Sequence, residues 1–342
     1  MKKAVFTVVR ALIGIVLAIL LIRWTLQGSD MNINRLWTNQ IQPAIIPLLL
    51  LAIMLHGTVL FTGALRWRLL LRAQDIDLGY LTVLRLTLTG FFFNLAVPGA
   101  VGGDLVKMGY TMRRAPEHKT AAVFSIVMDR VMGIMGLFVV AGVAVLLNLQ
   151  TIIRLGEENP YLQAGAVLIA LGSFAGVIGL LALQYHAVLV RHPRLEPLWD
   201  LCRRKLPHAI VFTVQRIMTA LDLYKKSKKV LAQALALAIL IHCILALNLF
   251  TIGQALRENK LSIGDYFVTT QVANAVAAVP VTPGGLGLRD KGAQEFFSAL
   301  GMAEHKSGAI PVTLTFILLL WALIGGAVFT VAPVSTKPPG PE

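Results

Sequence analysis

The chain has 342 residues, of which 56% are hydrophobic and only 14% are charged, and its mean hydropathy is +0.74. This composition lies far outside that of soluble domains, so it excludes a soluble catalytic domain and predicts a membrane protein. The net charge of +14 would indicate nucleic-acid binding in a soluble protein. Here the basic residues flank apolar runs, so they orient the chain in a membrane and no nucleic-acid partner is expected.

Six apolar runs are long enough to cross a hydrocarbon core about 30 Å thick, which takes about 20 helical residues. They cover residues 5–22, 44–65, 121–147, 162–183, 230–252 and 308–331. The first run follows Met-Lys-Lys, as a signal peptide would. Its length and the lack of a small-residue cleavage site favour a retained helix.

Two further apolar stretches, residues 81–110 and 263–300, are each interrupted by a glycine-rich turn. The turns are Pro98-Gly99-Ala100-Val101-Gly102-Gly103 and Pro283-Gly284-Gly285-Leu286-Gly287. If both stretches turn back, 21 lysines and arginines lie in the cytoplasm, among them Arg66 at the end of the second span; if both cross, only 10 do. Because cytoplasmic loops carry the excess of these residues, we predict two re-entrant helical hairpins. Both termini are then cytoplasmic, in a bacterial inner membrane.

These hairpins enter from opposite sides of the membrane, which predicts an inverted repeat. The pattern Pro98-Gly99-x-x-Gly102 recurs as Pro283-Gly284-x-x-Gly287, and the same shift brings the start of the second span close to that of the fifth. The predicted fold is therefore an all-α polytopic membrane protein with six full spans and two re-entrant hairpins. It forms one membrane domain over residues 1–336, with repeats at about 1–150 and 160–332 and a short tail at 337–342.

The longest predicted cytoplasmic loop, residues 184–229, is strongly basic. Within it, Val214, Ile217, Met218, Leu221 and Tyr224 recur at helical spacing, which predicts an interfacial helix. The lysines at 225, 226, 228 and 229 would meet anionic lipid head groups, or would serve only as an orientation signal for the next span.

Four charged residues fall inside the apolar segments: Asp129, Arg130, Arg289 and Asp290. Such residues cost roughly 2.5 to 3.5 kcal/mol at the centre of a membrane, so they face a pathway or a partner. Arginine offers a fork suited to phosphate, whereas the alternative is two structural ion pairs between neighbours in sequence. Asp104, which follows Gly-Gly at a predicted helix start, is either part of the site or an N-cap.

The glycine turns also predict where a ligand binds. A broken helix in a membrane is tolerated only where it is buried in protein or lines a wet cavity. Helices that restart after each turn would direct positive dipole ends toward the membrane centre, which suits phosphate. The alternative is that the glycines only let helices approach closely.

Signatures of catalysis and of metal binding are missing from the sequence. It has no His-Glu-x-x-His and no phosphate-binding loop with Lys-Ser or Lys-Thr. Cys202 and Cys243 lack metal-ligand spacing. His56 and His242 are lone histidines in apolar helices, which are more often packed than ligating. We expect no metal, no cofactor and no catalytic residues.

Three motifs together resemble one family, the lysylphosphatidylglycerol synthase transmembrane or flippase-like family. They are FNLAVPGAVGGDLVK at 93–107, DRVMG at 129–133 and TPGGLGLRD at 282–290. Ala100, Lys107, Asp129 and Asp290 depart from the usual residues but keep the charge pattern. No aminoacyl-transferase sequence follows residue 331, so the resemblance implies a stand-alone member.

The resemblance implies movement of a lipid between leaflets, and we expect a phosphate-bearing phospholipid or polyprenyl-type lipid as substrate. A membrane transferase acting on a lipid-linked precursor, supported weakly by Asp75, Asp77 and Asp104, and an accessory protein beside a lipid-modifying enzyme are the alternatives. The expected head-group site comprises Asn94, Pro98, Gly99, Gly102, Gly103, Asp104, Lys107, Asp129, Arg130, Pro283, Gly284, Gly285, Gly287, Arg289 and Asp290.

Overall fold

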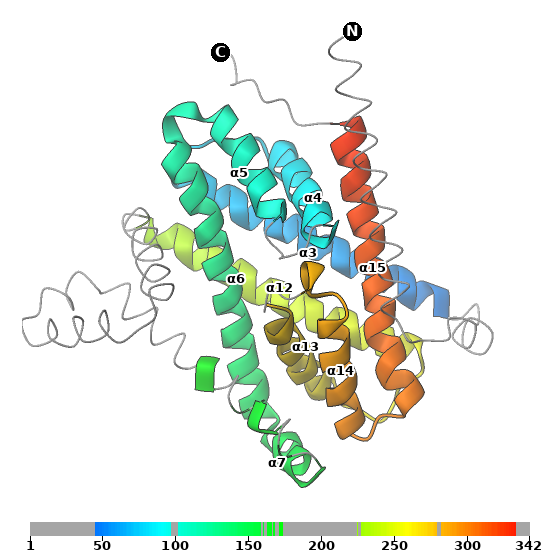
Figure 1. Ribbon diagram of the computed structural model, residues 1–342. Helices are drawn as coiled ribbons and strands as arrows, with labels where there is room; N and C mark the ends of the chain where they lie inside the picture. Colours follow the sequence, from blue (N-terminus) through cyan, green and yellow to red (C-terminus); the bar gives the residue numbers. More distant parts are fainter. Residues whose placement is uncertain are drawn as a thin grey trace, which may run out of the picture.

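A computed structural model describes residues 45–96, 102–158, 160, 163–165, 167, 171–173, 224, 227–278 and 282–332. Every regular element in these ranges is helical (Figure 1). The predicted span at 5–22, most of the span at 162–183, most of the basic loop and the tail lie outside the described residues. Residues 97–101 of the first glycine turn also lie outside them.

Among the described residues, four helices are long and apolar enough to cross a membrane. They are α3 (Ile46–Arg72), α6 (Lys119–Leu147), α12 (Lys228–Ala255) and α15 (Glu304–Val331). They coincide with four of the six predicted spans. Within the described residues, this confirms the prediction of an all-α, multi-pass membrane protein.

Each stretch with a glycine turn forms two helices, as predicted. The first gives α4 (Tyr80–Ala96) and α5 (Gly102–Arg114), and the second gives α13 (Ile263–Ala277), the single turn η3 (Pro283–Gly285) and α14 (Leu288–Ala299). The two helices of each stretch pack against each other, so both stretches form helical hairpins.

The α4–α5 hairpin closes at two points. The amide of Gly103 donates a hydrogen bond of 2.9 Å to Oδ1 of Asn94. A Cβ on Gly103 would lie only 1.9 Å from the carbonyl oxygen of Gly90, so only glycine permits this approach of α5 to α4. In the second hairpin Gly284, Gly285 and Gly287 have φ of 56°, 74° and 76°, values that favour glycine.

The same order of helices occurs twice along the chain. Helices α12, α13, α14 and α15 follow one another as α3, α4, α5 and α6 do, and the offset between matching helix starts is constant to within a few residues. Figure 1 shows that α3 and α12 run in opposite directions, as do α6 and α15. The remaining described elements are the turn η2 (Pro116–His118) and α7 (Leu149–Glu158).

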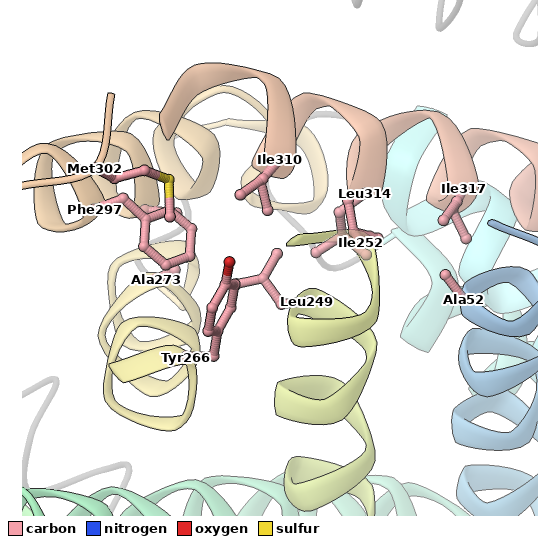
Figure 2. Packing of buried hydrophobic residues seen from close by; sticks show 11 residues of the cluster. Ala52, Leu249, Ile252, Tyr266, Ala273, Phe297, Met302, Ile310, Leu314 and Ile317 are labelled. Carbon is pink, nitrogen blue, oxygen red and sulfur yellow. The ribbon is translucent and has the colours of Figure 1, made fainter. Parts of the chain in front are cut away.

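The largest buried cluster joins helices of both groups (Figure 2). Tyr266 and Phe297 stack at 5.1 Å between ring centroids, beside Leu249 and Ile252 of α12 and Ile310 of α15. Ala52 of α3 closes the cluster at its other end. This packing fixes α14, and therefore its first-turn charges, against α15.

Candidate functional site

The second glycine turn lies against the end of α4, the helix that leads into the first glycine turn. A Cβ on Gly284 would lie 3.1 Å from Cδ1 of Leu95, near the end of α4. Leu95 and Phe92 also share a buried cluster with Leu286, which follows η3. The tip of the second hairpin therefore packs against the end of the helix that leads into the first turn, as a site between the two tips requires.

A charge cluster lies beside the first hairpin, and its best-buried pair is Arg66 with Asp129. Nε of Arg66 donates to Oδ1 of Asp129 at 2.8 Å, and the two side chains are 11% and 15% exposed. A Cβ on Gly133 would lie 3.6 Å from both terminal nitrogens of Arg66. The lack of a side chain at Gly133 therefore makes room for the guanidinium against α6.

A second pair links α5 to α6. Nε of Arg130 donates to Oδ2 of Asp104 at 2.7 Å, with Asp104 buried and Arg130 half exposed. Nζ of Lys107, one turn further along α5, lies 4.8 Å from the centroid of the Trp67 ring, within the range of a cation–π contact. Among the described residues no carboxylate forms an ion pair with Lys107, although the charges of both pairs act on it. We call these five residues the first charge cluster: Arg66, Asp104, Lys107, Asp129 and Arg130.

The second charge cluster consists of Arg289, Asp290 and Thr315. Arg289 donates from Nη2 to Oδ1 of Asp290 at 2.7 Å and to Oγ1 of Thr315 at 2.5 Å. The hydroxyl of Thr315 in turn donates to Oδ2 of Asp290 at 2.7 Å, and the amide of Gly287 lies 3.4 Å from the same oxygen. Both side chains of the ion pair are nearly buried.

The two clusters occupy matching places in the two groups of helices. The interval along the chain from Asp104 to Arg289 equals the interval from Arg130 to Thr315, and it also equals the interval between the two glycine turns. In each group, a first-turn residue of the second hairpin helix hydrogen-bonds to the long helix that follows. The position is therefore the same, while the charge of the hairpin residue is reversed.

The structure places the described residues of the expected site in two groups. Asn94, Gly103, Asp104, Lys107, Asp129 and Arg130 line the first hairpin and α6, and Gly284, Gly285, Gly287, Arg289 and Asp290 belong to the second. Pro98 and Gly99 lie outside the described residues. Gly102 opens α5 and Pro283 opens η3.

Two details differ from the sequence-based expectations. Arg66 does not flank a span at the surface, because it is buried and pairs with Asp129. Consequently Asp129 is not paired with its neighbour Arg130, whose partner is Asp104. The expected alternative of a neighbour pair holds only for Arg289 and Asp290.

The carboxylates that would support a transferase do not gather at one place. Asp77 pairs with Arg72 at the exposed end of α3, whereas Asp104 pairs with Arg130. Within the described ranges there is no group of three or more histidines, cysteines and acids that could hold a metal ion.

Comparison with known proteins agrees with this architecture. The family model described as lysylphosphatidylglycerol synthase TM region matches residues 11–326. The chain is also similar to UPF0104 membrane protein PH1989 of Pyrococcus horikoshii, with 23% identity over 326 residues that cover 92% of this chain and 94% of the relative. Because the match includes both hairpins and both charge clusters, the chain belongs to the lysylphosphatidylglycerol synthase transmembrane-region family.

Proposed function

We propose that the protein moves a phosphate-bearing lipid between the leaflets of the bacterial inner membrane, with the head group held between the hairpin tips. The observation that carries this proposal is the first charge cluster. Among the described residues it contains three cations and two carboxylates, an excess of one positive charge within an apolar helical protein. A charge that is withdrawn from water is costly unless an anion compensates it, and the partly buried Lys107 is the cation without a carboxylate partner among the described residues.

A phosphodiester fits this place. It carries one negative charge spread over two free oxygens, which matches the excess charge of the cluster. Lys107 acts as a point charge, and its ammonium has three donors to offer. Arg130, half exposed beside it, adds a planar fork of the type that binds phosphate.

Re-entrant hairpins are part of this proposal, and the helix lengths support them. Helices α4, α5, α13 and α14 have 17, 13, 15 and 12 residues, so they measure roughly 18 to 26 Å at 1.5 Å per residue. Each is shorter than the roughly 30 Å hydrocarbon core. Since the helices of each pair fold back on each other, neither pair adds up to one crossing.

We further propose that the two groups of four helices form an inverted repeat that rocks around the shared site. Supporting this are the matched helix starts, the opposite directions of α3 and α12 (Figure 1), and the matched contacts at Asp104 and Arg289. Inverted repeats typically place the substrate at their interface near the membrane centre. The packing of the second glycine turn against the end of α4 supports a site at such an interface.

The proposed orientation places the N- and C-termini and residues 184–229 in the cytoplasm. In the described ranges Arg68, Arg72, Arg113 and Arg114 lie at the ends of α3 and α5 that would face this side. Lys228 and Lys229 start α12 there. The lysines of the basic loop would contact anionic lipids.

The test is reconstitution into liposomes with a panel of fluorescent lipids: phosphatidylglycerol, phosphatidylethanolamine, a polyprenyl phosphate and a phosphate-free glycolipid. Accessibility of the fluorophore to dithionite reports movement between leaflets. We expect the phosphate-bearing probes to move and the glycolipid to stay. Lys107→Gln should slow lipid movement by about tenfold, which corresponds to the free energy of one charge-assisted hydrogen bond. Lys119→Gln, at an exposed lysine, is the matched control.

Mass spectrometry of the same vesicles separates the alternatives. Movement no faster than in protein-free vesicles, or equal rates for wild type and Lys107→Gln, would contradict the proposal. A covalent change in any probe would favour a transferase. Lipid binding without movement or chemistry would favour an accessory protein that hands a lipid to a partner enzyme.

A further inference from the structure

The interface between α3 and α12 buries polar residues that the proposed head-group site does not use. His56 of α3 and His242 and Asn248 of α12 are 3%, 8% and 0% exposed. Both helices are among the most apolar in the protein and are long enough to span a membrane. Polar side chains inside such helices are costly unless they have partners or face a wet pathway.

The hydrogen bonds of His242 leave one ring nitrogen free. Nε2 lies 3.1 Å from the carbonyl oxygen of Gly133. Because a carbonyl oxygen only accepts, Nε2 carries the proton, and Nδ1 of the neutral ring presents a lone pair. Nδ1 is buried and has no hydrogen-bond partner in the described part of the chain. Gln271 donates from Nε2 to the carbonyl oxygen of His242 at 3.4 Å, and its own Oε1 also has no partner.

His56 shows the complementary arrangement. Nδ2 of Asn248 lies 3.5 Å from Nδ1 of His56, so the amide donates and Nδ1 accepts. Nε2 then carries the proton of the neutral ring, and it is buried without a partner, as is Oδ1 of Asn248. Four unpartnered polar atoms thus lie along one pair of helices and the adjacent α13. Buried polar groups of this kind are ordinarily satisfied by internal water.

Each histidine is within the electrostatic influence of the arginine of one charge cluster. The charge of Arg66 acts on His242, and Arg66 lies against Gly133, whose carbonyl holds the ring. The charge of Arg289 acts on His56. Other groups lie around these arginines and histidines. Asp129 forms an ion pair with Arg66, and Arg289 donates hydrogen bonds to Asp290 and Thr315. The centroids of the Phe91 and His56 rings are 5.9 Å apart.

The helix register gives the order of these groups. Because α3 and α12 are antiparallel and Asn248 lies opposite His56, His242 lies six residues, or about 9 Å along the helix axis, from the level of His56. It lies on a different side of α12 from Asn248, where it contacts Gly133 of α6 and Gln271 of α13. Arg66 lies ten residues, or about 15 Å, from His56 in the same direction. Along the axis of α3 the order is therefore His56, His242 and Arg66.

We propose that His242 and His56, together with water held by the unpartnered atoms, form a proton path between the two charge clusters. A hydronium ion gives its proton to Nδ1 of His242 and leaves water; His242 later returns a proton to the water chain. His56 takes a proton on Nδ1 once its hydrogen bond from Asn248 opens, releases one from Nε2 to water, and returns to its starting tautomer when the ring turns over before the next proton. Only N–H and O–H bonds form and break, so one proton crosses per cycle and nothing is oxidised or reduced.

This inference deepens the proposed function, because a proton moving between the clusters would couple lipid movement to the proton gradient. The chemistry supports coupling: a proton that arrives beside Arg66 or Arg289 changes the local charge at the place where the phosphate is held. The path itself does not depend on the identity of the lipid, so the two claims can be tested separately.

The experiment uses the full chain in vesicles of a total bacterial phospholipid extract with a pH-sensitive dye inside. A potassium diffusion potential drives protons inward. Wild type should take up protons faster than protein-free vesicles, and His242→Gln and His56→Gln should each lower uptake by at least about tenfold. Glutamine can still donate to the Gly133 carbonyl, yet it cannot accept a proton near neutral pH. His305→Gln, at an exposed histidine outside the interface, should match wild type.

Gln271→Leu provides a second variant that leaves both histidines in place. It removes an unpartnered oxygen, so it should lower proton uptake several-fold even if a histidine variant does not fold. Wild-type uptake equal to that of protein-free vesicles, or wild-type uptake in both histidine variants, would overturn the proton path.

The fluorescent lipid assay in the same vesicles separates the two proposals. Lipid movement without protein-dependent proton uptake would overturn the path and leave the proposed function standing. Proton uptake that depends on both histidines, without movement of any lipid, would support the path and contradict the proposed function.

Discussion

Removing the negative charge of Asp129 should destabilise the protein strongly, because Arg66 would remain charged and buried. The two side chains are 11% and 15% exposed and meet at 2.8 Å. Breaking a buried pair by removing one partner costs roughly 3 to 5 kcal/mol. In Asp129→Asn the amide oxygen still accepts one hydrogen bond, so we expect the lower end, a loss of about 3 kcal/mol in the free energy of unfolding.

The assay is equilibrium unfolding in mixed micelles, followed by helical circular dichroism, with each variant compared at the same detergent composition. The matched control is the other ion pair of α3, between Arg72 and Asp77, whose side chains are 48% and 71% exposed. Asp77→Asn should leave the unfolding transition unchanged, because solvent screens this pair.

A double replacement tests the reason for the loss. Arg66→Met with Asp129→Leu removes both charges and should recover stability to within about 1 kcal/mol of wild type, since an apolar pair avoids the desolvation cost. If Asp129→Asn were as stable as wild type, Arg66 would not depend on Asp129 and the burial argument would be wrong. If the double variant were less stable than the single one, packing rather than charge would explain the loss.

Two further predictions concern packing and orientation. Gly103→Ala places a Cβ 1.9 Å from the Gly90 carbonyl oxygen, whereas Gly109→Ala on the same helix meets nothing within 4 Å. In the same unfolding assay we expect Gly103→Ala to lower the free energy of unfolding by at least about 1 to 3 kcal/mol and Gly109→Ala to leave it unchanged. Equal stabilities of the two variants would refute the close approach of α5 to α4. Single cysteines are placed at the exposed Lys228 and Lys260 in a cysteine-free background and tested with an impermeant maleimide. The cysteine at 228 should react only from the cytoplasm, and the cysteine at 260 only from the periplasm. Labelling of both from one side would contradict the proposed orientation.

The breaks in the hairpins were predictable from sequence because their cause is local. A proline followed by several glycines within six residues strongly favours a helix break, so the turns at 98–103 and 283–287 located the gaps between α4 and α5 and between α13 and α14. The shift along the chain that relates the two turns likewise anticipated the spacing of the helix starts.

The partners of the buried charges were not predictable in this way. Arg66 lies 63 residues from Asp129, and Asp104 lies 26 residues from Arg130, so both pairs depend on how α3, α5 and α6 pack. Counting basic residues grouped Arg66 with the flanking charges of α3. A signal was present, because Arg66 lies six residues before the end of that helix, too deep for a purely interfacial charge.

The buried polar residues His56, His242 and Asn248 of α3 and α12 were also missed, because each histidine is surrounded by apolar residues in the sequence. Only the antiparallel register places His56 opposite Asn248 and brings His242 toward Arg66. The proposed proton path therefore depends on contacts between the two groups of helices, which neither group reveals alone.

The most direct test of the central claim is the affinity of the purified protein for a short-chain phosphatidylglycerol, measured by isothermal titration calorimetry in wild type, Lys107→Gln and Lys119→Gln. If the net positive charge of the first cluster holds a phosphate, Lys107→Gln should raise Kd about 10- to 100-fold, corresponding to roughly 1.5 to 3 kcal/mol for a hydrogen bond to a charged group, while Lys119→Gln should bind like wild type. Equal affinities in all three proteins, or equally tight binding of a phosphate-free diacylglycerol of the same chain length, would contradict the claim.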